Sequence, residues 1–287
     1  MAALGLIAGS FANVCIHRLP REQSVVHPRS RCPRCQRPIA ALENVPVLSF
    51  LLLRGRCRGC GQPISWRYPL VEAWSGALWL GVALVRAPGP RAVVDAVFLT
   101  SLVVLALIDA EHQILPDVIT KPGVAAGFLA SLLPDAAVGP LESALAAAGG
   151  YLALAGVALV YRLTRGEEGL GRGDWKMAAM LGAFLGWQPL VLVVFIASLG
   201  GTVVGIGLLA WHRLQAAANP ALEPAGPAAA ADAAEGDAGE PAPEVDWHSR
   251  EGLKARLPLG TLLALAALPV YFGGSEVIRW YRGLFLG

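Results

Sequence analysis

The sequence has few charged residues for its length. Of its 287 residues, 15% are charged and 55% are hydrophobic, and the mean hydropathy is +0.54. Soluble domains carry about 25% charged residues, so this composition excludes an ordinary soluble domain and predicts a membrane protein. The formal net charge of +2 says little, because the charges are segregated along the chain.

The N-terminal segment lacks the marks of a signal peptide. MAALGLIAGSFANVCI, residues 1–16, has no basic start and no small-residue cleavage site. We interpret it as the end of a membrane-spanning helix and expect the true start to lie upstream.

Acidic residues are nearly absent from residues 17–68. The acids there are Glu22 and Glu43, whereas the arginines are Arg18, Arg21, Arg29, Arg31, Arg34, Arg37, Arg54, Arg56, Arg58 and Arg67. Loops with an excess of Lys and Arg stay in the cytoplasm. We therefore expect residues 17–68 to form a basic cytoplasmic loop.

Long apolar runs are abundant. Crossing about 30 Å of hydrocarbon takes roughly 20 apolar residues, and about eight segments approach this length. They are residues 1–16, 69–86, 92–109, 118–133, 141–161, 175–187, 189–211 and 257–273. Counting through eight crossings places segments 109–121 and 162–176 on the cytoplasmic side, beside the basic loop. Two acids far apart in sequence, Asp109 and Asp174, are thus predicted at one membrane face.

Four of the five cysteines form two CxxC pairs. The pairs are Cys32 and Cys35 in CPRC, and Cys57 and Cys60 in CRGC, and each is followed by a turn. This pattern is typical of a tetrahedral Zn²⁺ site made of four thiolates. Disulfides are the alternative, which a reducing cytosol disfavours. With no open coordination position, the zinc would be structural. We interpret the fifth, Cys15, as a buried and inert thiol.

These features predict an all-α polytopic membrane protein of about eight transmembrane helices with a small zinc-stapled cytoplasmic loop domain. Residues 213–256, rich in Ala, Pro, Gly and Glu from residue 216 onwards, are expected to be a disordered cytoplasmic linker. The predicted parts are a first helix (1–16), the zinc-binding loop (17–68), a transmembrane core (69–212), the linker (213–256), and a last helix with a tail (257–287).

Each membrane-edge acid has a structural interpretation when it is taken alone. Asp109 could mark where its helix reaches water, and Asp117, after Pro116, could be an N-cap. Asp174, in GRGD, could cap a helix that begins at Trp175.

The two acids predicted at one face suggest chemistry instead. Glycines in GRGD permit close backbone approach. Two carboxylates within a few ångströms cannot both ionise easily, so one stays protonated while the other acts as a base on water. This is the chemistry of an aspartic protease.

Five stretches carry a resemblance to a known family. They are GSFANVCIHRLP, CPRC, ALENVPVLSFLLLRGRCRGCGQPISWRYPLVE, LIDAEHQILPD and GLGRGDWKMAAMLGAFLGW. In this order and spacing they resemble the type IV prepilin peptidase family, over nearly all of residues 5–212. The resemblance implies an inner-membrane aspartic peptidase of the GxGD type with eight spans and a cytoplasmic active site. Such enzymes remove the leaders of prepilins and of type II secretion pseudopilins after a glycine, and many then methylate the new N-terminus with S-adenosylmethionine.

The resemblance also implies site residues. It places the catalytic acids at Asp109 and Asp174 and the zinc ligands at the four paired cysteines. Supporting residues are Gly171 and Gly173, which shape the approach to Asp174; Glu111, where many relatives carry Asp; and Lys176, which either holds Asp174 or is a solvated, snorkelling lysine.

Three departures from the family pattern stand out. Relatives have several more residues before GSFANV, and the linker from residue 216 replaces a short loop. RLPLGT, residues 256–261, keeps Pro258 and Gly260 of a PFGP-like stretch but lacks its Phe and second Pro.

Methylation rests on the resemblance alone, because no glycine-rich nucleotide loop is visible. The S-adenosylmethionine site therefore stays unassigned. The alternatives are a peptidase without methylation, or a non-catalytic membrane scaffold that docks partners through the zinc loop. The expected partners are prepilin or pseudopilin substrates and the lipid bilayer, with no nucleic acid.

Overall fold

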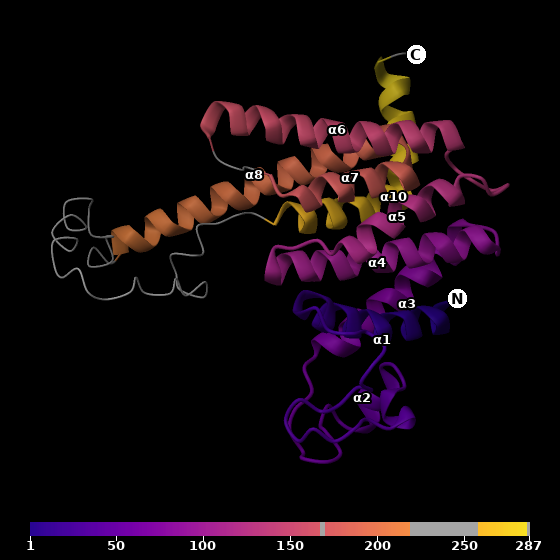
Figure 1. Ribbon diagram of the computed structural model, residues 1–287, viewed down its shortest axis with the longest axis vertical. Coiled ribbons are helices and arrows are strands. Elements are labelled where there is room, and N and C mark those ends of the chain that lie inside the picture. Colours follow the sequence, from indigo (N-terminus) through magenta and orange to yellow (C-terminus); the bar gives the residue numbers. More distant parts are fainter. Residues whose placement is uncertain (167–169, 219–257, 286–287) are drawn as a thin grey trace. The chain divides into compact units, whose positions relative to one another are not determined.

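The computed structural model describes residues 1–166, 170–218 and 258–285 (Figure 1). The predicted linker falls mostly outside these residues. The helices are α1 (Ala2–Arg18), α2 (Leu48–Leu52), α3 (Arg67–Val85), α4 (Pro90–His112), α5 (Asp117–Ala130), α6 (Pro140–Arg165), α7 (Arg172–Leu185), α8 (Trp187–Ala218) and α10 (Leu259–Phe285), with 3-10 turns at Leu19–Arg21 and Ala41–Asn44. Within the described ranges, β-structure is limited to two isolated bridges, so the all-α class is confirmed.

Six helices are long and apolar enough to cross a membrane: α1, α3, α4, α6, α8 and α10. Helices α5 and α7 lie where the other two spans were expected, but each has 14 residues, or about 21 Å at 1.5 Å per residue. The expected helix positions are therefore found, whereas the count of eight spans is not confirmed.

The chain divides into two compact units. One contains Met1–Ala197 and Pro258–Gly287, and the other contains Ser198–Leu257. The described part of the second unit is the C-terminal stretch of α8, residues 198–218. The five-part division expected from the sequence remains a prediction.

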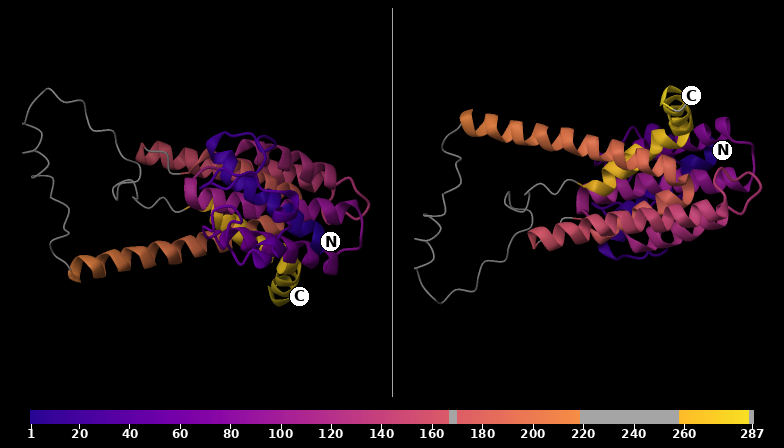
Figure 2. Two further views of the ribbon diagram at one scale, coloured as in Figure 1. Left: turned by 90° about the horizontal axis from the view of Figure 1, so that it is seen from below. Right: turned by 90° about the horizontal axis from the view of Figure 1, so that it is seen from above.

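Helix α4 lies at the centre of the first unit. It packs against α1, α3, α5 and α10, while α7 packs against α5, α6 and α10 (Figures 1 and 2). Leu99, Leu102, Leu105 and Ile108 of α4 are fully buried. Asp109 follows Leu102 and Leu105 at spacings of seven and four, so the buried face of α4 ends in a carboxyl group.

Small residues let neighbouring helices approach closely. A Cβ at Gly9 of α1 would lie 2.6 Å from the Cα of Glu72 in α3, and one at Gly182 of α7 would lie 2.4 Å from the carbonyl oxygen of Ala146 in α6. Close backbone approach is how helices associate in a bilayer, where burial of apolar surface gives little driving force.

A buried ionic network joins the helices at the far end of α4 from Asp109. Asp95 is fully buried and pairs with Arg86 and Arg91, whose side chains come from the end of α3 and the start of α4. Tyr271 of α10 donates to Asp95 at 2.8 Å. Arg91 also donates to the Ala130 carbonyl at the end of α5, at 2.9 Å. The ends of α3 and α5 and the middle of α10 are thus each tied to the start of α4 by a polar contact.

Helix α10 contains an interior proline, Pro269, and it bends along its length (Figures 1 and 2). Proline lacks an N–H and clashes with the preceding turn, which bends a helix. The stretch before Pro269 packs Leu263, Ala264 and Ala267 into the core. Its first turn meets the end of α4 at Asp109.

Candidate active site and metal centre

Asp109 is buried at the end of α4 and is held by the first turn of α10. Asp109 is only 5% exposed to solvent. The Thr261 N–H donates to its Oδ2 at 2.7 Å, and the Thr261 hydroxyl lies 3.0 Å from the same oxygen. A Cβ at Gly260 would lie 3.0 Å from both the Cγ and Oδ2 of Asp109. Glycine at 260 therefore allows the carboxylate to reach the helix terminus.

Asp174 is buried in the first turn of α7. The N-cap of α7 is Gly171, and the helix starts at Arg172 rather than at Trp175, so Asp174 is its third residue. Gly171, not Asp174, is the N-cap residue, which corrects the interpretation of Asp174 as the cap of a helix that begins at Trp175. Burial, and then the charge of Asp109, raises the pKa of Asp174 to about 6, although a hydrogen bond from the Gly171 backbone opposes this. The two acids thus interact electrostatically.

Leu115 connects the surroundings of the two acids. A Cβ at Gly173 would lie 2.8 Å from the Cβ of Leu115, and one at Gly260 would lie 2.9 Å from its Cδ1. The starts of α7 and α10 thus both pack against Leu115, which lies in the segment between α4 and α5. The second glycine of GRGD is needed for this close packing.

The four paired cysteines converge in the loop between α1 and α3. Their sulfur atoms all lie within 4.8 Å of one another, and the Sγ atoms of Cys32 and Cys60 are 3.9 Å apart. Four sulfurs at 2.3 Å from a tetrahedral zinc would be about 3.8 Å apart. All of the cysteines are free thiols, so disulfides are not formed. The donor set and its spacing fit Zn²⁺.

The two CxxC pairs have the same backbone conformation. The Cys32 N–H donates to the Arg37 carbonyl, and the Cys57 N–H donates to the Gln62 carbonyl, at 3.0 and 2.8 Å. Each turn closes through a residue of positive φ, Gln36 at 59° and Gly61 at 69°. The knuckles aim both pairs of sulfurs at one point.

The pKa values of two of the thiols, Cys32 and Cys60, are shifted by their surroundings. N–H groups of Cys35 and Arg34 lower the pKa of Cys32 to about 6. At Cys60 the Gln62 N–H acts in the same direction, but burial and hydrogen bonds with the other three thiols raise its pKa to about 11. Four adjacent thiols cannot all lose protons without a positive ion, and a metal supplies it.

Comparison with known proteins agrees with this geometry. Residues 3–86 match the bacterial peptidase A24 N-terminal domain, and residues 96–206 match the type IV leader peptidase family. A prepilin leader peptidase/N-methyltransferase of Aeromonas hydrophila is 42% identical, over 98% of this chain and 92% of its own length. The chain belongs to the type IV leader peptidase family. With its membrane-length helices, it is a multi-pass membrane protein.

Further relatives of this chain carry the same name. One from Klebsiella pneumoniae is 48% identical over 68% of this chain and 87% of its own length. One from Myxococcus xanthus is 48% identical over 72% of this chain and 61% of its own length. No solved structure matches the chain. The resemblance found in the sequence is confirmed.

Lys176 and Asp117 have other roles in the structure than those expected from the sequence. Lys176 pairs with Asp117, with Nζ and Oδ1 2.5 Å apart, rather than with Asp174. Asp117 is the first residue of α5 and Pro116 is its N-cap, so Asp117 is not the cap. Lys121 pairs with the other oxygen of Asp117 at 2.7 Å, and both lysines lower the pKa of Asp117. Lys176 therefore joins α7 to α5 through Asp117, whereas Lys121 pairs with Asp117 within α5.

Glu111 connects the acid end of α4 to the metal loop. It pairs with Arg67, the first residue of α3, which directly follows the loop. The loop is also tied down by Glu72 of α3, which accepts from the Val47 N–H at 2.7 Å. Asn13 of α1 donates to the Tyr68 carbonyl. The metal centre and Asp109 thus lie at the same end of the helices.

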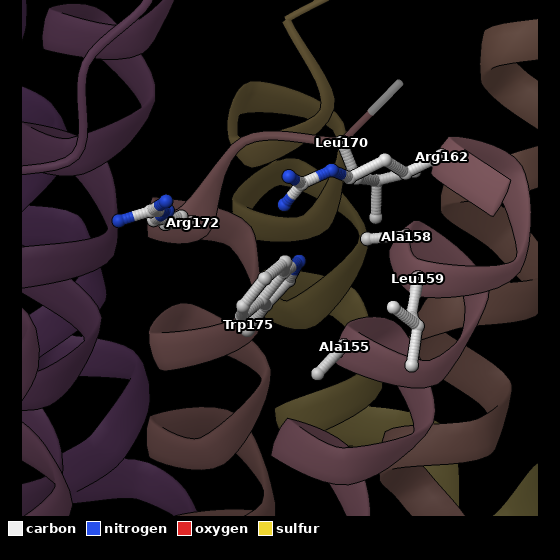
Figure 3. A pocket seen from close by; sticks show the side chains of 7 residues that line it. All are labelled: Ala155, Ala158, Leu159, Arg162, Leu170, Arg172 and Trp175. Atoms are coloured by element: carbon white, nitrogen blue, oxygen red, sulfur yellow. The ribbon is translucent and has the colours of Figure 1, made fainter. Parts of the chain in front are cut away.

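A small pocket of about 80 Å³ lies between α6 and the start of α7 (Figure 3). It is lined by Ala155, Ala158, Leu159, Arg162, Leu170, Arg172 and Trp175. The Trp175 Nε1 is buried and has no acceptor among the described residues. In Figure 3 this nitrogen is on the side of the ring that faces the Arg162 guanidinium. The pocket therefore has apolar walls and several N–H donors.

Sequence reasoning missed two residues of this site. Thr261 was noted only as a departure from PFGP, and its contact with Asp109 bridges 152 positions of sequence. Glu43 was counted only as a rare acid. It accepts from Arg37 at 2.9 Å and from Arg58 at 3.4 Å, one arginine from each knuckle, so it holds the two together. A lone acid between two basic CxxC pairs was the available signal.

Proposed function

We propose that this protein is a membrane aspartic endopeptidase that removes the leader peptide of type IV prepilins or type II secretion pseudopilins after a glycine. N-methylation of the new N-terminus follows cleavage in this proposal. The observation that carries it is the pair of buried acids, Asp109 and Asp174, at one end of a bundle of membrane-length helices. The names of the relatives, prepilin leader peptidase/N-methyltransferase, agree with both steps.

The unlike surroundings of the two acids suggest which is the base. Asp109 accepts hydrogen bonds from Thr261 at a helix N-terminus, where a carboxylate is stabilised. Asp174 holds its proton to higher pH than an ordinary Asp, because burial and the Asp109 charge raise its pKa. We therefore assign Asp109 as the general base and Asp174 as the general acid.

The reaction follows from these roles. Asp109 takes a proton from a water, and the water oxygen attacks the scissile carbonyl carbon. Asp174 donates its proton to the peptide nitrogen as the C–N bond breaks, which releases an amine and a carboxylic acid. Asp109 then carries the proton taken from water, and proton exchange with solvent restores the starting pair.

The pocket at Trp175, the residue that follows Asp174, offers a place for part of the substrate chain. An extended peptide presents carbonyl oxygens, and the Trp175 N–H is a buried donor that lacks a partner in the described structure. Its small volume suits a stretch of backbone or one side chain. A substrate carbonyl that accepts from Trp175 would help to hold the substrate in place for cleavage.

Zinc, held by Cys32, Cys35, Cys57 and Cys60, is structural in this proposal. Four thiolates fill a tetrahedral site, so the metal supplies folding free energy to the loop and no open position for water.

S-adenosylmethionine is the methyl donor that the methyltransferase activity implies. The pocket at Trp175, of about 80 Å³, is well below the 300–1,000 Å³ or so typical of ligand sites. It does not fit this cofactor, and we assign no residue to it.

The location proposed is the bacterial inner membrane, with the acids and the metal loop on the cytoplasmic side. The arginine-rich loop supports this orientation through the positive-inside rule. The substrates are themselves membrane helices, so they would reach the acids from within the bilayer. Neither alternative from the sequence is favoured, because a scaffold leaves the interacting acids without a role.

Replacement of the two acids tests the proposal. In Asp109→Asn or Asp174→Asn, cleavage of a prepilin in detergent should fall at least about a thousandfold, because an amide can neither activate water nor donate its proton. Glu276→Gln, an exposed acid elsewhere on α10, is the control and should cleave normally. Mass spectrometry of the product reads cleavage and N-methylation separately. Near-normal cleavage by Asp174→Asn would refute the assignment.

A further inference from the structure

Thr261 makes two kinds of contact with α4. Its N–H and its hydroxyl both lie within hydrogen-bond distance of Asp109 Oδ2, at 2.7 and 3.0 Å. The hydroxyl is also 3.0 Å from the carbonyl oxygen of Ala106, one turn before Asp109. One hydroxyl has a single proton, so it can serve the carboxylate or the carbonyl, or be shared between them.

The contact places a carboxylate on a helix N-terminus. Thr261 is the third residue of α10, so its N–H has no partner within the helix. Unpaired N–H groups and the positive end of the helix dipole favour the charged form of an acid. Gly260 leaves the space for this approach, because a Cβ there would crowd the Asp109 carboxyl at 3.0 Å.

We propose that Thr261 is a positioning residue that keeps Asp109 ionised and oriented, and so decides which of the two acids is the base. The inference rests on the proposed function and adds a determinant to it. Proline, which stands at this place in the PFGP-like stretch that Pro258 and Gly260 resemble, could supply neither donor.

Other charged groups near this end of the helices have partners of their own. Glu111 pairs with Arg67 of α3, and His112 lies 3.9 Å from Glu111. On α5 and α7, Asp117 pairs with Lys121 and Lys176. At the end of α1, Arg18 donates to the Ser24 and Pro28 carbonyls, and His17 lies beside Arg18, Arg21 and Arg67.

The partners described for Asp109 are therefore Thr261, through hydrogen bonds, and Asp174, through its charge. Thr261 favours the charged form of Asp109, whereas burial of its carboxyl and the charge of an ionised Asp174 disfavour it. By stabilising the carboxylate form of Asp109, the two Thr261 donors favour Asp109 as the base.

Three variants of Thr261 separate this role from packing. Thr261→Val keeps the shape and the N–H but removes the hydroxyl, and Thr261→Ser keeps both donors. Thr261→Pro removes both donors, and a proline is tolerated in the first turn of a helix. The readout is the pH dependence of kcat/KM for prepilin cleavage in detergent, with melting temperature as a check on folding.

We expect Thr261→Val to lower kcat/KM about tenfold near the optimum, a typical effect of one hydrogen bond to a charged group. Its acid limb should move to higher pH by about half a unit to one unit, because an ionised Asp109 has lost a donor. Thr261→Ser should stay within about twofold of the parent. Thr261→Pro, if folded, should show the larger shift.

Two outcomes would overturn the proposal. One is an acid limb in Thr261→Val that coincides with the parent, since lost activity alone would then reflect packing against Ala106. The other is a Thr261→Ser enzyme as impaired as Thr261→Val. Failure of the proposed function is distinguishable, because it would appear as cleavage by Asp109→Asn, whatever the Thr261 variants do.

Discussion

Asp109 and Asp174 are the same residue type in unlike surroundings, and this difference lets two carboxyl groups take different roles. Asp109 ends a buried helix face and accepts from Thr261, whereas Asp174 begins a helix and accepts little. The sequence predicted both acids because their motifs are local. It could not predict Thr261, because a contact between α4 and α10 exists only once the two helices are packed.

The pH profile of cleavage should report both acids. As pH rises through the Asp174 pKa of about 6, Asp174 loses the proton that the leaving amine needs, so activity falls. As pH decreases, Asp109 becomes protonated and cannot activate water. The kcat/KM profile should therefore be bell-shaped, with its alkaline limb far above the ordinary Asp value of about 3.9. A profile that is flat from about pH 4 to about pH 8 would contradict the paired titration.

Asp117 should matter much less than the catalytic pair. Asp117→Asn removes the charge that pairs with Lys121 and Lys176, and these groups are partly exposed, where an ion pair contributes little. We expect cleavage within about fivefold of the parent, measured beside Asp109→Asn in the same assay. A loss as large as that of Asp109→Asn would mean that Asp117 belongs to the catalytic group.

At the scale of elements, the metal loop owes its shape to two knuckles and one acid. CPRC and CRGC predicted the four ligands from spacing alone, and the sulfurs do converge. The role of Glu43 was not predictable in the same way. Arg37 and Arg58 are brought to it by the two knuckles, so its partners depend on the folded loop.

Metal analysis should find about one zinc per purified chain. Cys32→Ser should lose it, because three thiolates leave the tetrahedral set incomplete. Cys15→Ser is the matched control, since Cys15 lies in α1 outside the cluster, and it should retain the metal. A metal-free protein with four alkylatable thiols, or one with two disulfides, would contradict the zinc assignment.

Glu43→Gln should loosen the loop without removing a ligand. The amide has no charge for Arg37 and Arg58, so the knuckles should separate more readily and release zinc faster to a chelator. The zinc content before chelation should stay close to one per chain. Release at the parental rate would show that the two arginine contacts do not hold the knuckles together.

At the scale of the whole molecule, helix order was more predictable than membrane topology. Hydropathy located every helix that the structure describes as long, because each needs an apolar run. It could not decide whether α5 and α7 cross, since 14 residues fall short of a full span. Contacts decide instead which ends lie together. Asp117 with Lys176, Asp109 with Thr261, and Glu111 with Arg67 gather the ends of five helices beside the metal loop.

Labelling across the membrane tests which side carries this end. Helix α6 has span length, with exposed Asp135 before it and exposed Arg165 at its last turn. Because α7 begins soon after Arg165 and carries Asp174 in its first turn, Arg165 marks the side of the acids. In a Cys15→Ser background, Arg165→Cys should react with an impermeant maleimide in inside-out vesicles, and Asp135→Cys should react in spheroplasts. Bound zinc should protect the four loop cysteines from the maleimide. The Cys15→Ser protein without an added cysteine is the control, and it should remain unlabelled. The reverse pattern would place the acids outside the cytoplasm and would refute the orientation drawn from the arginine-rich loop.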